Sequence, residues 1–261
     1  MALRSLNESE KPVVSTNILQ RGKVALVTGG TSGIGLALVK QLQALGMTVF
    51  FCARDSDRVA QVARELPGTT GTVCDASDAT QLEAMAADVA ASTDRLDLLV
   101  ANVGGLEDLN FCNAPLPIEH IASQICLNLT APALTVNTFL PLLRKSGSGQ
   151  IVFIGSGFGW SPSGRAPLYS AAKAGVRAFA KALRSQLGSQ GIAVMEVVPP
   201  TVDTPAVAQK GGKKIPPETV AAATIAGISK GKREVFVGQT KAMPWLLRLA
   251  PYVLERITLS E

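Results

Sequence analysis

The stretch VALVTGGTSGIG, residues 24–35, decides the fold of this chain of 261 residues. Its first five residues are apolar or β-branched and predict a buried strand, and the apolar residues from Leu38 to Leu45 follow at helical spacing. The glycines between them allow a tight turn, and a pyrophosphate there would be stabilised by the free N–H groups of the helix N-terminus. The stretch therefore predicts a phosphate-binding βα unit, with a purely structural glycine turn as the alternative.

The same alternation of strand and helix continues along the chain. Strand-like runs cover residues 24–28, 48–53, 70–74, 97–102, 150–155, 192–198 and 234–238. Helical periodicity covers residues 117–143, 167–188 and 218–229, the first two long and rich in small residues that suit an oligomer contact. Several strand runs are apolar throughout, as in strands covered on both faces. We therefore expect a Rossmann-type α/β fold, a doubly wound parallel sheet of about seven strands with helices on both faces.

Length and composition favour one globular domain. Apolar residues make up 47% of the chain and charged residues 17%, which excludes a disordered or fibrous protein. We assign residues 1–20 to an N-terminal extension and residues 21–261 to a single domain. The four cysteines form no CxxC pair, and we expect free thiols and a cytoplasmic protein without a secretory signal or a membrane-spanning run.

The C-terminal segment, residues 240–261, is amphipathic, with apolar residues interspersed among Lys241, Arg248 and Arg256. Such a segment can pack on its own core, on a partner subunit or on a membrane surface. We expect packing, because the segment lacks a flanking polybasic run.

The net charge of +5 is unevenly distributed. Residues 210–256 contain nine lysines and arginines against three acids. This excess either attracts an anionic substrate or forms an ordinary solvated face, which is the commoner case. Nucleic-acid binding is not expected, because aromatic residues are not interleaved with the cations. His120 has no neighbours at metal-ligand spacing, so we expect a solvated histidine and no metal site.

Beyond the fifth strand, a serine, a tyrosine and a lysine have the spacing of a catalytic group. Ser156 follows the strand, Tyr169 comes thirteen residues later, and Lys173 lies one helical turn beyond. An adjacent ammonium would lower the pKa of the phenol toward neutrality. Tyr169 would then exchange a proton with a substrate oxygen, to which Ser156 would also donate a hydrogen bond.

The glycine turn, TGxxxGxG, together with Ser156 and the Tyr169-x-x-x-Lys173 pair, resembles the short-chain dehydrogenase/reductase family over roughly residues 22–240. The resemblance implies hydride transfer to or from a nicotinamide and a catalytic tetrad in which Asn128 holds a water that connects Lys173 to solvent. It also implies that Asp75, with Ala76 beside it, contacts the adenine, and that Lys173 holds the nicotinamide ribose. The contacts to the cofactor are then expected at Gly29, Thr31, Ser32, Gly33, Ile34, Arg54, Asp75, Ala76, Asn102, Gly104, Tyr169, Lys173, Val202 and Thr204.

The residue after the second strand indicates which nicotinamide is used. Arg54 stands where an NAD enzyme has an acid for the ribose 2′-hydroxyl, and a guanidinium suits the 2′-phosphate of NADP(H). Thr31 and Ser32 add hydroxyl donors. We therefore expect NADP(H), with an ordinary surface arginine as the alternative.

Two positions depart from the family pattern. Val103 replaces the usual alanine of Asn-Ala-Gly, and Pro200 replaces the glycine of Pro-Gly after strand six. Pro200 removes an N–H beside the nicotinamide. Residues 199–204, PPTVDT, are similar to a branch that includes the oxidoreductase of the D-alanyl-lipoteichoic acid cluster.

The substrate pocket is expected to be lined by Phe158 and Trp160, by the loop 105–117 and by the residues after Thr204, although the two aromatics would also suit the edge of the sheet. The short segment 204–216 suggests an open site or a bulky substrate. We expect an NADP(H)-dependent reductase of a medium-sized, partly apolar carbonyl or imine compound, in a homodimer or homotetramer. A nucleotide sensor or scaffold without turnover, and a dehydratase or epimerase, are the alternatives.

Overall fold

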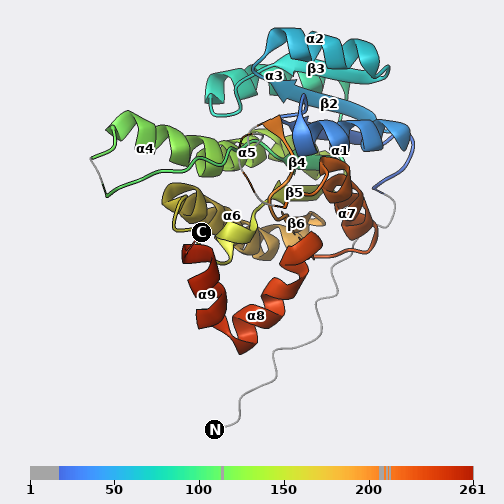
Figure 1. The fold of residues 1–261 in the computed structure, drawn as a ribbon. Coiled ribbons are helices and arrows are strands. Elements are labelled where there is room, and N and C mark those ends of the chain that lie inside the picture. The colour runs from blue at the N-terminus through green and yellow to red at the C-terminus, as the bar shows by residue number, and fades with distance from the viewer. Residues whose placement is uncertain (1–17, 113–114, 206–208, 210, 212, 261) are drawn as a thin grey trace.

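The computed structural model describes residues 18–112, 115–205, 209, 211 and 213–260 and contains one sheet of seven parallel strands in the order β3-β2-β1-β4-β5-β6-β7 (Figure 1). The strands are β1 (Val24–Thr28), β2 (Thr48–Ala53), β3 (Thr69–Val73), β4 (Leu98–Ala101), β5 (Gln150–Ile154), β6 (Ala193–Val198) and β7 (Glu234–Phe236). All seven predicted strands are present, most of them one or two residues shorter than expected.

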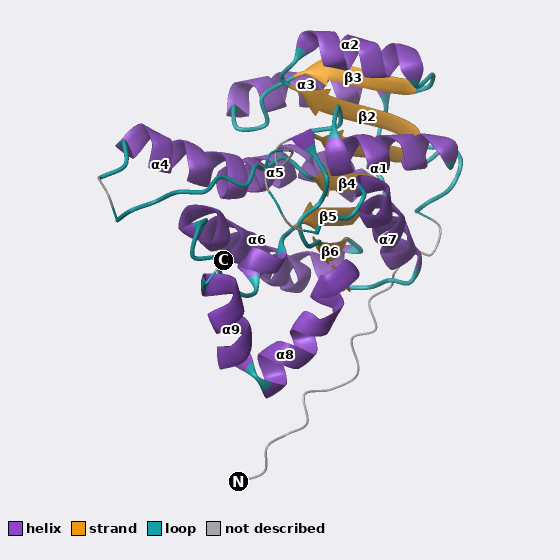
Figure 2. Cartoon of the chain, in the orientation of Figure 1, coloured by secondary structure: helices purple, strands orange, loops and turns teal. Residues whose placement is uncertain are grey.

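Helices cover both faces of the sheet (Figure 2). One face packs against α3 (Ala79–Ser92), α5 (Ala131–Lys145) and α6 (Pro167–Leu187), and the other against α1 (Gly33–Ala44), α2 (Ser56–Glu65) and α7 (Pro217–Ser229). Two buried clusters result, with Phe139 and Phe153 in one and Leu38 and Phe51 in the other. The doubly wound fold predicted from the sequence is confirmed.

The sheet reverses its strand order between β1 and β4. Strands β2 and β3 lie on one side of β1, whereas β4, β5, β6 and β7 lie on the other. In an open parallel sheet, the loops at such a reversal diverge and leave a crevice at the carboxyl ends of the strands. The turns after β1, β4 and β5 all open into this crevice.

The predicted helix 117–143 is interrupted. It consists of α4 (Ile118–Ile125), a π-helical turn at Cys126–Thr130 and α5, which ends at Lys145. Pro132 lies in the first turn of α5 and has no N–H for the continuous hydrogen-bond ladder that was expected. Wide turns of this kind are frequent at functional sites, and this one contains Asn128.

The folded body starts earlier than expected, and its C-terminal segment is divided in two. Ile18 is buried against the core, so the folded body begins before residue 21. The rest of the N-terminal extension lies outside the described residues. The C-terminal segment forms two helices, α8 (Met243–Leu249) and α9 (Pro251–Leu259), because Pro251 ends the first hydrogen-bond ladder and Ala250 leaves the helical conformation.

Taken together, α4, the π-helical turn and α5 (Ile118–Lys145) are long and apolar enough by length and composition to cross a membrane, which corrects the expectation that the chain has no such run. In its most apolar window, 39% of the residues are buried within the protein. The run contains Phe139 and Leu143 of the core, so packing against the sheet accounts for much of its apolar surface.

Asp97 joins β1 to the beginning of β4. Its carboxylate is fully buried and accepts hydrogen bonds from Lys23 Nζ at 2.9 Å, from the Val24 backbone N–H at 2.9 Å and from Arg95 Nε at 3.4 Å. A buried carboxylate such as this one stabilises the fold only while all three hydrogen-bond donors remain in contact with it.

We therefore expect Asp97→Ala to lower the free energy of unfolding by about 3 kcal/mol, because it leaves two cations and a backbone N–H without their partner. Urea unfolding followed by circular dichroism measures the change. Asp94→Ala, at an exposed neighbouring carboxylate, should change it by less than about 0.5 kcal/mol. Equal losses in the two variants would contradict the role of Asp97.

Candidate active site

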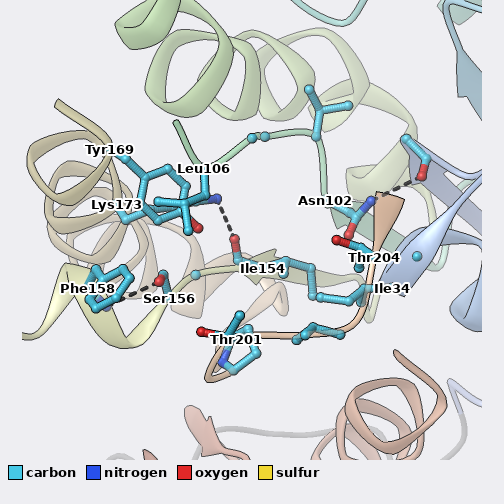
Figure 3. Close-up of a pocket in the computed structure, with 18 of the residues that line it drawn as sticks. Ile34, Asn102, Leu106, Ile154, Ser156, Phe158, Tyr169, Lys173, Thr201 and Thr204 are labelled. Carbon is cyan, nitrogen blue, oxygen red and sulfur yellow. Dashed lines mark hydrogen bonds between the residues drawn. The ribbon is translucent and has the colours of Figure 1, made fainter. Parts of the chain in front are cut away.

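A cavity of about 1010 Å³ lies at the carboxyl ends of the strands (Figure 3). Its walls come from the turns after β1, β2, β3, β4, β5 and β6 and from the C-terminal helices α8 and α9. Of the candidate site residues, all but Asn128 and Trp160 line this cavity.

The glycine turn is held by close backbone approaches. Gly29 and Gly33 have φ of 68° and 52°, where a side chain would be strained. A Cβ on Gly35 would overlap the Gly29 carbonyl oxygen. Asn102 donates from Nδ2 to the carbonyl oxygens of Thr28 at 2.9 Å and Gly29 at 3.2 Å. Asn102 therefore fixes the turn from the end of β4, in addition to its predicted place in the cavity wall.

The start of α1 presents unused donors to the cavity. Thr31, Ser32, Gly33 and Ile34 all line it, and the Ser32 side chain makes no capping hydrogen bond to the helix. The first N–H groups of a helix have no partners within the helix, and its dipole favours an anion there. This end of the cavity has the chemistry of a phosphate site.

Two arginines border the cavity beyond the end of β2. Arg54 is the predicted one, and its side chain is 72% exposed, with Nη1 lying 3.9 Å from Asp75 Oδ2. Arg58, one helical turn later on α2, also lines the cavity and was missed. Its i,i+4 spacing from Arg54 in the sequence was the available signal. Neither guanidinium is held by a short ion pair within the described part of the chain, because Arg54 lies 3.9 Å from Asp75 and Arg58 lies 3.6 Å from Asp55.

The predicted adenine contacts lie in the same region. Asp75 and Ala76 both line the cavity. The Asp75 carboxylate accepts hydrogen bonds from the Ser77 backbone N–H at 2.9 Å and from Ser77 Oγ at 2.7 Å, which fix its orientation.

Ser156, Tyr169 and Lys173 meet at the opposite end of the cavity (Figure 3). Ser156 Oγ accepts a hydrogen bond from the Phe158 backbone N–H at 3.1 Å, and Tyr169 lies close enough for Ser156 to affect its pKa. Lys173 is 3% exposed, donates from Nζ to the Ile154 carbonyl oxygen at 2.9 Å, and lies 5.7 Å from the centre of the Tyr169 ring. Strand β5 thus holds the lysine in place, and the serine that follows the same strand lines the cavity together with the phenol.

The pKa values correct one expectation. Burial raises the pKa of the Tyr169 phenol above its usual value, and the nearby Ser156 hydroxyl only partly opposes this effect. Burial also lowers the pKa of Lys173 to about 8, opposed by the negative charge of Glu196. The expected lowering of the phenol pKa by Lys173 is therefore not found, because desolvation dominates. Tyr169 remains protonated at neutral pH, which suits a proton donor.

Asn128 is fully buried in the π-helical turn. Its Oδ1 accepts a hydrogen bond from the Gly105 N–H at 2.9 Å, and its Nδ2 donates to the Gln124 carbonyl oxygen at 3.1 Å. A Cβ on Gly104 would lie 2.9 Å from Asn128 Oδ1 and 3.1 Å from Lys173 Nζ. The structure therefore brings Asn128, Gly104 and Lys173 together, as the tetrad requires.

The loop after β6 closes the cavity on the side of the glycine turn. Val202 pairs with Ile215 in an isolated bridge, and Thr204 contacts the position of Gly33. Pro199 and Pro200 both line the cavity. Part of the segment 204–216, including Lys210, lies outside the described residues.

Trp160 does not line the cavity, and the prediction that it does is wrong, whereas Phe158 does line it. The indole packs edge-on against Phe236 with ring centres 4.9 Å apart, and the Arg177 guanidinium lies 3.5 Å above the ring centre. Its Nε1 donates to Glu196 Oε1 at 3.4 Å. The alternative, packing at the edge of the sheet, is thus what the structure shows, and Trp160 anchors the turn that follows Ser156.

Glu196 is a buried carboxylate that the sequence analysis did not identify. It is fully buried on β6, and its Oε2 has no hydrogen-bond partner among the described residues. Burial raises its pKa to about 7. A Cβ on Gly155 would lie 2.5 Å from Oε1, so the carboxylate packs directly beneath the turn to Ser156. Because the rest of this strand is apolar, the single glutamate within it was the only signal in the sequence.

The C-terminal helices supply a wall that the sequence did not assign to the pocket. The lining residues there are Met243, Leu246, Leu254, Ile257 and Thr258. Thr258 Oγ1 and Ser161 Oγ lie 2.8 Å apart in a buried hydrogen bond, and the Gly164 N–H donates to the Thr258 carbonyl oxygen at 3.2 Å. Because these contacts link regions remote in sequence, periodicity alone could not reveal them.

No group of three or more His, Cys, Asp or Glu residues suited to a metal ion occurs within the described part of the chain. His120 Nε2 lies 3.1 Å from Glu107 Oε1 on the outer side of α4.

Comparisons with known proteins agree with this geometry. A family model described as short chain dehydrogenase matches residues 23–214. The chain is 33% identical over 217 residues to the uncharacterized oxidoreductase DltE of Bacillus subtilis (strain 168), covering 80% of this chain and 86% of that one. It is 40% identical over 189 residues to a putative ketoacyl reductase of the granaticin polyketide synthase of Streptomyces violaceoruber, covering 70% and 68%.

Solved structures show the same architecture. A short chain dehydrogenase from Burkholderia cenocepacia J2315 in complex with NADP superposes with a TM-score of 0.82 at 23% identity, covering 92% of this chain and 99% of that one. An actinorhodin polyketide ketoreductase with NADPH gives 0.76 at 29% identity, covering 83% and 95%. Since the family model spans well over half of the sequence, this protein belongs to the short-chain dehydrogenase family.

Proposed function

We propose that this protein is an NADP(H)-dependent reductase that converts a ketone or other carbonyl compound, or an imine, to the secondary alcohol or amine. The observation that carries the proposal is the convergence of Ser156, Tyr169 and Lys173 in one cavity with the glycine turn. A proton donor and a phosphate-binding turn at opposite ends of one cavity suit a dinucleotide that extends between them.

The residues present fit NADP(H). The pyrophosphate would lie on the glycine turn and the start of α1, where Ser32 has no capping bond. Arg54 and Arg58 border the end of the cavity that would hold the adenosine, and two guanidinium groups suit a 2′-phosphate. The complexes of related structures with NADP and NADPH support this choice.

The carbonyl reaction divides between the cofactor and the protein. NADPH, when bound, supplies the hydride. Tyr169 donates its proton to the substrate oxygen, and Ser156 donates a hydrogen bond to the same oxygen as negative charge develops there. Lys173, positive below pH 8, stabilises the phenolate that remains and would hold the nicotinamide ribose. Asn128 lies in the π-helical turn beside Lys173, where a water would carry a proton from solvent to the lysine.

The cavity walls near Ser156, Tyr169 and Lys173 favour a medium-sized, partly apolar substrate. Phe158 and Leu106 face the same space as Met243, Leu246 and Leu254. The resemblance to putative ketoacyl reductases supports a carbonyl substrate of this character.

For Tyr169→Phe we expect turnover to fall by roughly 10²- to 10⁴-fold, because the phenol proton is lost while the ring is kept. NADPH binding, followed by fluorescence titration, should stay within about twofold of the wild type, since the hydroxyl contributes little to affinity. Turnover close to that of the wild type would exclude Tyr169 as the proton donor.

The double change Arg54→Ala and Arg58→Ala should weaken NADPH binding by roughly 10- to 100-fold and leave NADH binding nearly unchanged, since hydrogen bonds to charged groups contribute about 1.5–3 kcal/mol. Titration with each nucleotide measures the ratio. Arg64→Ala, an exposed arginine of α2 outside the cavity, is the matched control. A double variant that still prefers NADPH as strongly as the wild type would contradict this assignment.

The pH dependence follows from Lys173. Its positive charge is present below a pKa of about 8 and is lost as the pH rises through that value, so kcat/KM for reduction should fall above about pH 8. Glu196 raises the pKa of Lys173, so Glu196→Gln should move this limb to lower pH while preserving the shape of the side chain. Glu83→Gln, on the exposed face of α3, should not move it. If kcat/KM of Glu196→Gln falls at the same pH as that of the wild type, the carboxylate does not act on Lys173.

A further inference from the structure

The hairpin of helices α8 and α9 carries most of the exposed large apolar side chains of the described residues. They are Trp245, Leu246, Leu249, Tyr252, Val253, Ile257 and Leu259, with exposed fractions from 37% to 84%. Figure 1 shows the two helices as a V whose apex, at residues 249–252, points away from the sheet. A concentration of exposed apolar side chains on one helix pair marks a contact with another apolar phase or molecule.

The hairpin is firmly attached at both of its ends. Thr240, just before α8, donates to the Val198 carbonyl oxygen at 2.6 Å, and Thr258, near the end of α9, bonds with Ser161 in a buried contact. Met243 and Leu254 are buried on its inner side. The exposed apolar side chains are therefore a fixed outer surface of a helix pair already packed on the body.

The charges around this surface are positive. Lys241, Arg248 and Arg256 are exposed, and Glu255 is the single exposed acid among residues 240–260. A shallow groove on α9 is lined by Tyr252, Val253, Arg256, Ile257 and Ser260, which places a guanidinium among apolar side chains. Trp and Tyr beside Lys and Arg are the residues that favour the interface between lipid headgroups and acyl chains.

We propose that the α8–α9 hairpin docks on the surface of an anionic lipid bilayer, with its apex inserted among the headgroups. Charge complementarity favours this occupant over a second copy of the chain. A two-fold contact through the same surface would gather Arg248 and Arg256 of both copies in one interface, with Glu255 as the only acid of residues 240–260 to pair with them, whereas anionic headgroups neutralise them. A protruding apex also suits insertion better than a flat self-complementary contact.

The surface continues into the cavity. Leu246 and Ile257 belong both to the exposed surface and to the cavity wall. A docked hairpin would therefore place the mouth of the cavity at the level of the lipid headgroups, where an apolar compound dissolved in the bilayer could enter. The docking itself does not depend on the proposed reductase activity, and it is measured without substrate.

Vesicle flotation tests the docking with the full-length protein. Vesicles of phosphatidylcholine with about one third phosphatidylglycerol should carry the protein upward, and pure phosphatidylcholine vesicles should carry less. Leu249→Ser with Tyr252→Ser should weaken binding by about tenfold or more through lost apolar insertion. Arg248→Gln and Arg256→Gln should each weaken binding to the anionic vesicles by about fivefold. Ile118→Ser, at an equally exposed apolar residue of α4, is the matched control and should bind like the wild type.

Fluorescence gives a local readout, because the chain has only two tryptophans. Anionic vesicles should shift the emission to shorter wavelength in the wild type but not in Trp245→Phe, in which Trp160 remains. Equal NADPH binding and thermal unfolding would show that the variants are folded. A wild-type protein that does not float with anionic vesicles, or that floats equally well without Leu249 and Tyr252, overturns the proposal. Conversion of a dimer to a monomer by the same pair of changes, without vesicle binding, assigns the surface to a second copy and also overturns it.

Discussion

The site depends on one buried ammonium group. Lys173 is held on α6 with its Nζ hydrogen-bonded to the Ile154 carbonyl oxygen of β5, and burial brings its pKa close to the physiological range. Because a desolvated cation is unstable without partners, its surroundings are constrained. Gly104 must lack a side chain for Asn128 and Lys173 to meet beside it, and Glu196 supplies the compensating negative charge from β6.

Much of the fold and of the site could be predicted from local sequence. The parallel sheet of seven strands follows from the alternation of apolar strands and helices, and the glycine turn and the Tyr169-x-x-x-Lys173 pair each lie within one short stretch of sequence. Trp160 was assigned wrongly because its partners, Arg177, Glu196 and Phe236, come from three separate elements. The same reason explains why the pKa of Tyr169 was expected to fall, since burial is a property of the assembled fold.

The C-terminal helices show the limit of periodicity most clearly. Residues 240–261 have an amphipathic pattern, which cannot say whether the apolar side faces the core, the cavity or the outside. The structure shows that the apolar residues are shared among all three, because Pro251 divides the segment into two helices with different orientations. A single helix with one apolar stripe would have buried most of that stripe against the body.

Transfer of a labelled hydride tests the central claim most directly. NADPH carrying deuterium at both C4 positions would be mixed with the protein and a panel of ketones and imines, and the products examined by mass spectrometry. The account predicts deuterium on the former carbonyl or imine carbon of at least one product, together with oxidised NADP. Bound NADPH that stays fully reduced across a panel that includes apolar ketones of medium size would contradict the assignment as a reductase.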